Sequence, residues 1–213
     1  MWATLSAPWQ VCLELVWEAY CDDCYPIGAV VTDGSGKILT RGRNRIYENR
    51  VRYGRERGNE LAHAEVEALR ALDFPAIDPH TCILYTTTEP CPMCMGTFYM
   101  SGLRSLYFAS RDPYAGSVDL LGKTRYLSKK PIKIFGPADP ALEIVIMAMA
   151  VEQECSNHGG RLIWDAVHQR WAEVIPQGVE LGRSLGRSGE LSAMRKKGAG
   201  PAEVMDWLIT LVK

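Results

Sequence analysis

The chain has 213 residues, a formal net charge of −1 and 47% hydrophobic residues. This length fits one large domain, or one domain with an extension, and the composition is that of a globular protein with a sizeable core. A charge near zero argues against a dedicated nucleic-acid binder, because such domains are usually basic. The longest apolar run, residues 144–151, is far shorter than a membrane span, so we expect no membrane association.

The start of the chain and its cysteines bear on the cellular compartment. The first residues lack the basic stretch and apolar run of a signal peptide. The cysteines number seven, which is odd, and in the absence of an export signal we expect reduced thiols in a cytoplasmic protein. A pair at Cys21 and Cys24 has no obvious further ligands, and we interpret it as structural or incidental.

The first quarter of the chain predicts a helix followed by a β-hairpin. Ser6, Ala7 and Pro8 are typical of a helix start, and apolar side chains follow at helical spacing over residues 9–20. Residues 27–32 and 37–43 are predicted strands, joined by a turn rich in Gly and Asp. Residues 44–59 form a long, arginine-rich loop, and loops of this length are usually functional or disordered.

Two short motifs follow, His63-Ala64-Glu65 and Cys91-Pro92-Met93-Cys94. The first opens a segment of strong helix formers, and the second follows a predicted strand at residues 82–87. Pro92 in this motif, and Pro90 just before it, are tolerated only in the first turn of a helix, where two cysteines three residues apart share one face. The positive end of the helix dipole favours thiolate, which is the metal-binding form of cysteine.

One histidine and two cysteines make three protein ligands for zinc, and Glu65 is left over. Structural zinc sites are closed by four protein ligands, whereas catalytic sites leave the fourth position to water. The combination of H-x-E with P-C-x-x-C is the signature of zinc deaminases that act on nucleobases. We therefore expect one catalytic Zn²⁺ per chain, bound by His63, Cys91 and Cys94. Glu65 is predicted to carry protons from water to a ring nitrogen and to the departing amine.

The chain resembles the cytidine deaminase and tRNA-adenosine deaminase superfamily between roughly residues 9 and 137. The segments that carry the resemblance are residues 26–31, 43–45, 62–65, 88–94 and 111–117. The Glu-Pro-Cys-Pro-Met-Cys string is most similar to the branch that holds tRNA adenosine deaminases, guanine deaminases and bacterial nucleoside deaminases. The Asp-Pro-x-Ala-Gly string is closer to the adenosine members of that branch.

The order of predicted elements indicates an α/β fold, a three-layer α/β/α sandwich with a five-stranded mixed sheet. The resemblance implies the same fold. The last strands are expected near residues 104–109 and 132–135, with a further helix between them, and another helix follows at residues 140–154. We divide the chain into a deaminase domain, residues 1–156, and a helical C-terminal extension, residues 157–213. The extension would serve in packing, as an oligomer arm, or as a lid; glycines punctuate it, and its tryptophans are interpreted as packing anchors.

Substrate contacts are expected around the zinc site, in a tight pocket whose polar groups read the edge of a ring. The resemblance implies that Asn44 contacts the substrate. The backbone N–H of Ala64 and the region of Glu89 are further candidates. Tyr114 would stack on the ring or its sugar, or else be a surface aromatic. Asp112 would order its loop through local turn bonds, or act as a second proton carrier.

Three functions are compatible with these features. We favour a homodimeric zinc-dependent hydrolytic deaminase that converts the exocyclic amine of a free nucleobase or nucleoside to a carbonyl and releases ammonia. The near-neutral charge and the non-basic tail support a small substrate. The alternative is a tRNA adenosine-to-inosine deaminase, which residues 112–116 and the arginine-rich loop favour. The third is a non-catalytic, zinc-stabilised interaction protein, and the intact Glu65 argues against it.

Overall fold

The computed structural model describes residues 2–48, 59–157 and 162–212. Its helices and strands are α1 (Ala7–Cys21), β1 (Gly28–Thr32), β2 (Ile38–Arg43), α2 (Ala64–Arg70), β3 (Ile83–Thr88), α3 (Pro92–Ser101), β4 (Ser105–Ser110), β5 (Lys133–Phe135), α4 (Pro140–Asn157), α5 (Leu162–Val174), α6 (Pro176–Ser188), α7 (Glu190–Lys196) and α8 (Pro201–Thr210). Part of the predicted arginine-rich loop, residues 49–58, lies outside the described residues.

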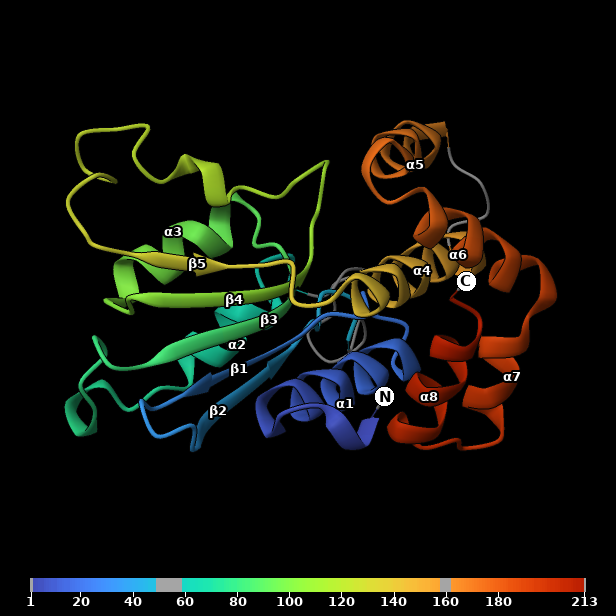
Figure 1. Cartoon of the computed structure of the whole chain (residues 1–213), viewed down its shortest axis with the longest axis horizontal. Helices are drawn as coiled ribbons and strands as arrows, with labels where there is room; N and C mark the ends of the chain where they lie inside the picture. Colours follow the sequence, from blue (N-terminus) through green and yellow to red (C-terminus); the bar gives the residue numbers. More distant parts are fainter. Residues whose placement is uncertain (1, 49–58, 158–161, 213) are drawn as a thin grey trace.

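The five strands form one sheet in the order β2-β1-β3-β4-β5 (Figure 1). β1 runs antiparallel to both β2 and β3, whereas β3, β4 and β5 are parallel to one another. The predicted mixed five-stranded sheet is therefore confirmed. The prediction of a helix between β4 and β5 is wrong. The segment holds only the 3₁₀ turn Val118–Leu120, because Gly116 and Gly122 flank it and glycine disfavours helix.

Alternation along β1 shows how the three layers are built. Ala29 and Val31 pack into a core with α2 and α3, while Val30 between them packs against α1. Successive side chains of a strand point to opposite faces of the sheet, so α1 lies on the face opposite α2 and α3. All five residues of β1 are buried, as expected of a strand covered on both faces.

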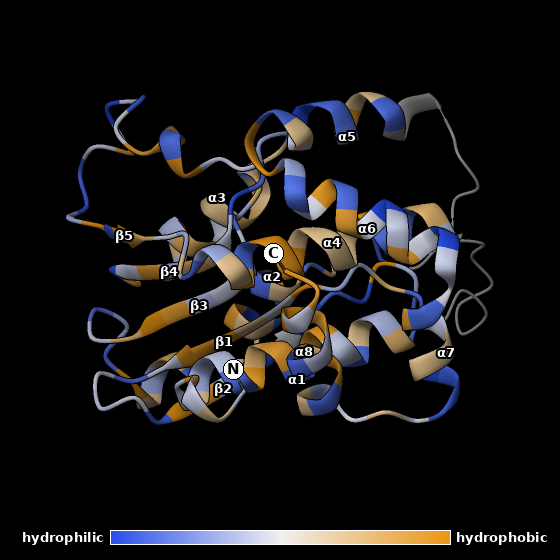
Figure 2. Cartoon of the chain, turned by 45° about the vertical axis from the view of Figure 1, so that its right-hand side comes forward, coloured by the Kyte–Doolittle hydropathy of each residue, from blue (hydrophilic) through white to orange (hydrophobic). Residues whose placement is uncertain are grey.

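Helices α5 to α8 gather beside α4, beyond one end of the sheet (Figure 1). Helix α8 buries Val204, Met205 and Leu208 in the same core cluster as Val16 of α1. The indole N–H of Trp17 donates a hydrogen bond of 2.8 Å to the carbonyl of Ala199. The extension thus shares a hydrophobic core with α1 and α4. In Figure 2, β3 is largely orange, whereas α5 and α6 carry long hydrophilic segments. None of the described helices combines the length and apolarity that a membrane crossing requires.

Three glycines of the extension lie inside α6 and do not interrupt it. Gly178, Gly182 and Gly186 recur every four residues and so share one face of the helix, which packs against α4. A Cβ atom on Gly182 would lie 2.6 Å from the carbonyl oxygen of Ala148. These glycines therefore allow the two helices to approach closely, and only Gly189, with a φ of 68°, ends the helix.

We predict opposite effects for two Gly→Ala substitutions inside helices. Gly182→Ala should lower the free energy of unfolding by roughly 1–3 kcal/mol, the usual cost of overpacking, because the backbone of α4 has to move. Gly96→Ala is the control, since nothing lies within 4 Å of its new Cβ. It should raise the free energy of unfolding by about 0.5–1 kcal/mol through helix propensity. Denaturant unfolding followed by circular dichroism measures both, and stabilisation by Gly182→Ala would contradict this packing.

Candidate active site

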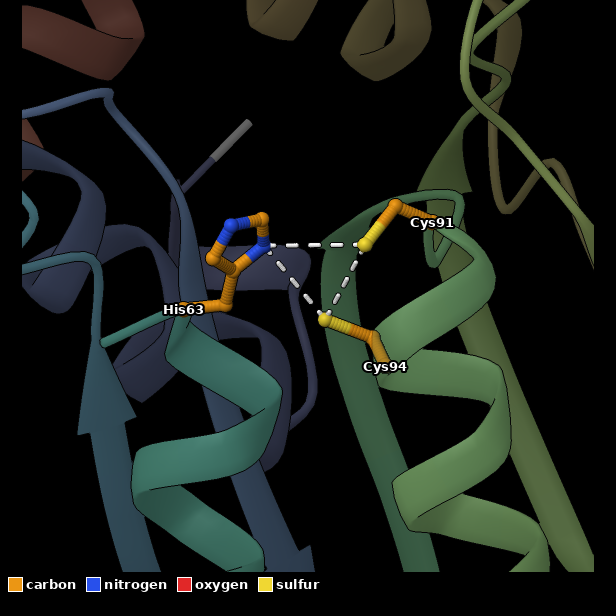
Figure 3. A group of neighbouring side chains, drawn as sticks. All are labelled: His63, Cys91 and Cys94. Atoms are coloured by element: carbon orange, nitrogen blue, oxygen red, sulfur yellow. Dashed lines mark hydrogen bonds between the residues drawn. The ribbon is translucent and has the colours of Figure 1, made fainter. Parts of the chain in front are cut away.

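The two sequence motifs meet where α2 and α3 begin. His63 is the residue immediately before α2, and Cys91 holds the same position before α3. Cys94 lies in the first turn of α3, so its side chain points in the same direction as that of Cys91 (Figure 3). Because β3 ends three residues before Cys91, the sheet fixes where α3 starts.

The three side chains converge on one point (Figure 3). The Nδ1 atom of His63 lies 3.7 Å from the Sγ of Cys91 and 3.5 Å from the Sγ of Cys94, and the two sulfur atoms are 3.5 Å apart. Tetrahedral zinc with ordinary bond lengths places its nitrogen and sulfur ligands roughly 3.5–3.8 Å from one another. The donor set and its spacing therefore fit a zinc ion with one open position.

The electrostatics of the cluster also suit a metal. Hydrogen bonding with Cys94, and then with His63, lowers the pKa of the Cys91 thiol to about 4, although burial opposes the shift. The same hydrogen bond and burial raise the pKa of Cys94, so in this pair Cys91 is the thiol that loses its proton first, and thiolate is the form that binds zinc.

Glu65 lies beside this cluster and is held in place. Its side chain is buried, and Oε1 accepts a hydrogen bond of 3.0 Å from the Thr86 hydroxyl. Its Oε2 is 3.3 Å from the Sγ of Cys94. Burial raises the pKa of the Glu65 carboxyl above its usual range. The carboxylate thus stands next to the metal ligands without belonging to the group of three.

A cavity of about 250 Å³ opens onto these residues, and it has two halves. The deaminase half includes His63, Glu65, Cys91, Asn44, Glu89, Asp112 and Tyr114, and the other half is supplied by Ile146, Met147, Ala150 and Glu154 of α4 with Val167 and Trp171 of α5. The extension therefore contributes to this wall through Val167 and Trp171 of α5, beside the residues of α4.

The predicted substrate contacts are only partly brought together. Asn44 lines the cavity, and its Oδ1 accepts the N–H of Ile46 at 3.1 Å. Tyr114 also lines it, although 60% of its surface is exposed. Ala64 is fully buried in the core with α3 and is not among the residues that line the cavity.

Glu89 and Asp112 line the cavity, and both also hold the loop after β4. The carboxylate of Glu89 accepts the backbone N–H groups of Asp112, at 3.3 Å, and of Val118, at 3.4 Å. Asp112 Oδ1 accepts the backbone N–H groups of Tyr114 and Ala115, at 3.0 and 3.1 Å. These bonds fold the segment into a turn that lines the cavity.

The sequence offered a lid as one role of the extension, but it did not indicate which of its residues reach the site. Trp171 packs in a cluster with Met147 and Val167, as a packing anchor should. Its indole N–H also donates a hydrogen bond of 2.9 Å to Oδ1 of Asp112, 59 residues away. Tyr25 and Glu154 line the cavity too, and neither belongs to a motif. Only the tertiary fold reveals such residues, because their partners are distant in sequence.

The charge of the cavity is predominantly acidic. Arg111 is the one lysine or arginine among the described lining residues, and its guanidinium is bound by Glu143 through contacts of 2.7 and 2.8 Å. This bidentate pair joins the loop after β4 to the first turn of α4. The described lining therefore offers no unpaired cation for a phosphate group.

Comparisons with known proteins agree with this geometry. Residues 4–110 match the cytidine and deoxycytidylate deaminase zinc-binding region. A guanine deaminase from Bacillus subtilis is 34% identical over 87 residues, which are 40% of this chain and 50% of that protein. A tRNA-specific adenosine deaminase from Agrobacterium fabrum is 35% identical over 104 residues, 46% of this chain and 59% of that protein.

One matched protein is much longer, and one is a solved structure. The tRNA(Ile)-lysidine synthase of Deinococcus radiodurans is 36% identical over 95 residues, so this chain spans only 15% of it. A solved guanine deaminase from Nitrosomonas europaea superposes with a TM-score of 0.50 at 28% identity, over 70% of this chain and 85% of that one. The family match covers half of the chain and contains the three residues positioned for a metal, His63, Cys91 and Cys94. The chain therefore belongs to the zinc-binding family of cytidine and deoxycytidylate deaminases.

Proposed function

We propose that this protein is a hydrolytic deaminase that converts the exocyclic amine of a free nucleobase or nucleoside to a carbonyl and releases ammonia. The observation that carries the proposal is the cavity of about 250 Å³, which joins Glu65 and the zinc ligands to a wall made by α4 and α5. This volume is at the small end of ligand pockets, so it suits a single small ring compound. The similarity to guanine deaminases supports the same class of substrate.

The residues present can carry out such a reaction. Zinc, when bound, lowers the pKa of its water so that hydroxide is available near neutral pH. Glu65 takes the proton of the attacking water and passes it to a ring nitrogen as the carbon–oxygen bond forms. It then takes the proton of the newly added hydroxyl group and passes it to the amine, which leaves as ammonia while the carbonyl forms. One carboxylate can serve each step because Thr86 orients it toward the cavity that holds the ring.

The alternative function is deamination of adenosine in tRNA. The similarity to a tRNA-specific adenosine deaminase favours it. A wall built by α4 and α5 and a lining without an unpaired cation among the described residues argue for a small substrate. Ammonia release from a panel of bases, nucleosides and an adenosine-containing anticodon stem-loop decides between them. Release from bases or nucleosides alone supports the proposal, and release from the RNA alone overturns it.

The metal content provides a first prediction for this function. Elemental analysis should find about one zinc per chain, and Cys91→Ala should lose it together with much thermal stability, because the ion ties the starts of α2 and α3. Cys82→Ala is the control, since Cys82 is also buried but lies outside the ligand group. It should keep its zinc. Full zinc retention in Cys91→Ala would remove Cys91 from the ligand set.

The second prediction isolates the proton transfers assigned to Glu65. Glu65→Gln should fold, keep its zinc and bind substrate, because the amide preserves the shape of the side chain. Its turnover should fall by on the order of 10² to 10⁴, the usual contribution of general acid–base catalysis. Steady-state kinetics together with zinc analysis measure both properties.

Glu67→Gln is the matched control for that experiment. Glu67 lies on the same helix, but its carboxylate pairs with Arg70 and Arg45 on the outer side of α2 and does not line the cavity. Glu67→Gln should retain most activity, because its partners Arg70 and Arg45 are exposed and the pairs lie away from the cavity. Wild-type turnover in Glu65→Gln would leave the proposed mechanism without its central group.

A further inference from the structure

The wall of the cavity opposite the zinc ligands carries a carboxyl group that the deamination chemistry does not use. Glu154 comes from the last turns of α4, and its side chain lines the cavity although only 2% of the residue is exposed. Among the described residues, the Tyr25 hydroxyl is the one donor beside this carboxyl, and its two oxygens are otherwise unsatisfied. A buried carboxylate with so few donors is costly, so its position favours a ligand that donates a hydrogen bond.

A second carboxylate on the same helix shows the contrast. Glu143 is also buried, but both its oxygens are taken by the guanidinium of Arg111. Glu154 has no such cation, because Arg111 is the one described lysine or arginine of the lining and Glu143 already binds it. Burial raises the pKa of Glu154 to about 7, and the neighbouring Tyr25 hydroxyl opposes the shift. Its other neighbours in the lining, Met147 and Ala150, are apolar.

We propose that Glu154 accepts a hydrogen bond from the ring N–H of a free nucleobase, at the nitrogen that carries the sugar in a nucleoside. This inference rests on the proposed deaminase function, and it narrows the substrate class to free bases. With the amine directed to Glu65 and the zinc ligands, the opposite part of the ring faces α4. In cytosine and in the purines, that part of the ring system bears the N–H in question.

The same geometry disfavours a nucleoside. A sugar on this nitrogen would remove the donor and leave the buried carboxylate facing carbon atoms. Sites built to hydrogen-bond a substrate group reject analogues that lack it by far more than sites that only exclude bulk. A cavity of about 250 Å³ also leaves little room for a sugar beside the ring. The hydroxyl groups of ribose are the other possible source of donors, and the experiment below separates the two.

The test compares each base with its methylated counterpart. Calorimetry on the full-length Glu65→Gln protein, loaded with zinc, measures binding of guanine, adenine and cytosine, of their methylated forms 9-methylguanine, 9-methyladenine and 1-methylcytosine, and of guanosine, adenosine and cytidine. At least one free base should bind roughly tenfold to a hundredfold more tightly than its methylated form, as expected for a hydrogen bond to a charged group. Adding Glu154→Gln should weaken that base by a similar factor and leave its methylated form unchanged.

The control is Glu152→Gln on the same helix, whose buried carboxyl is bound by the Ser156 hydroxyl at 2.8 Å and does not line the cavity. It should leave both affinities unchanged. With Glu65 intact, Glu154→Gln should raise KM for the free base and change kcat little, which gives a second readout.

Several results would overturn the proposal. Equal weakening of a base and its methylated form by Glu154→Gln would mean a structural role only. Tighter binding of a nucleoside than of its base, lost in Glu154→Gln, would assign the carboxylate to ribose hydroxyls. Failure of all three bases to bind would also overturn the proposal. A protein that binds a free base in the predicted way but releases no ammonia from it would retain this subsite and fail as the proposed enzyme, so the two failures are distinguishable.

Discussion

The structure depends on one constraint: the starts of two helices must bring one imidazole nitrogen and two cysteine sulfur atoms within 4 Å of one another. β3 delivers Cys91 to the start of α3, and the packing of α2 against β1 and β2 delivers His63 to the start of α2. Both positions lie before the first helical residue, where backbone N–H groups are unpaired and the helix dipole stabilises thiolate. The sheet sets the distance between the helices, and the ion, once bound, holds it.

A second set of contacts completes the site from the opposite direction. Glu89 and Asp112 fold the loop after β4, and the indole of Trp171 reaches Asp112 from α5. The Arg111–Glu143 pair joins the same loop to the start of α4. The loop is therefore clamped between the deaminase core and the extension. We infer that the residues 157–213 set apart on sequence grounds act with the core as one folded unit at the cavity.

Whether a part of the structure could be predicted depends on how close together in the sequence its characteristic residues lie. The grouping of His63, Cys91 and Cys94, with Glu65 beside them, could be predicted because each motif places its residue types at a fixed spacing within a few positions. The mixed sheet could be predicted because apolar runs and turn residues alternate in order. The helix expected between β4 and β5 came from the order of elements and not from a local pattern, and the structure has only the 3₁₀ turn Val118–Leu120 there. Trp171 and Glu154 could not be assigned to the site, because their partners lie far away in sequence and no local spacing marks them.

The glycines of α6 show how a weak local signal becomes decisive in three dimensions. In the sequence they look like interruptions, since glycine lowers helix propensity. In the fold, Gly178, Gly182 and Gly186 allow α6 to lie against α4 more closely than any side chain would permit. α5 is joined to α6 through the buried Ile175, and Val167 and Trp171 of α5 pack in the same cluster and line the cavity. The glycines of α6, a helix that does not line the cavity, thus help to place Trp171 against Asp112. The shape of the substrate pocket therefore depends on the packing of the extension as well as on the zinc motif.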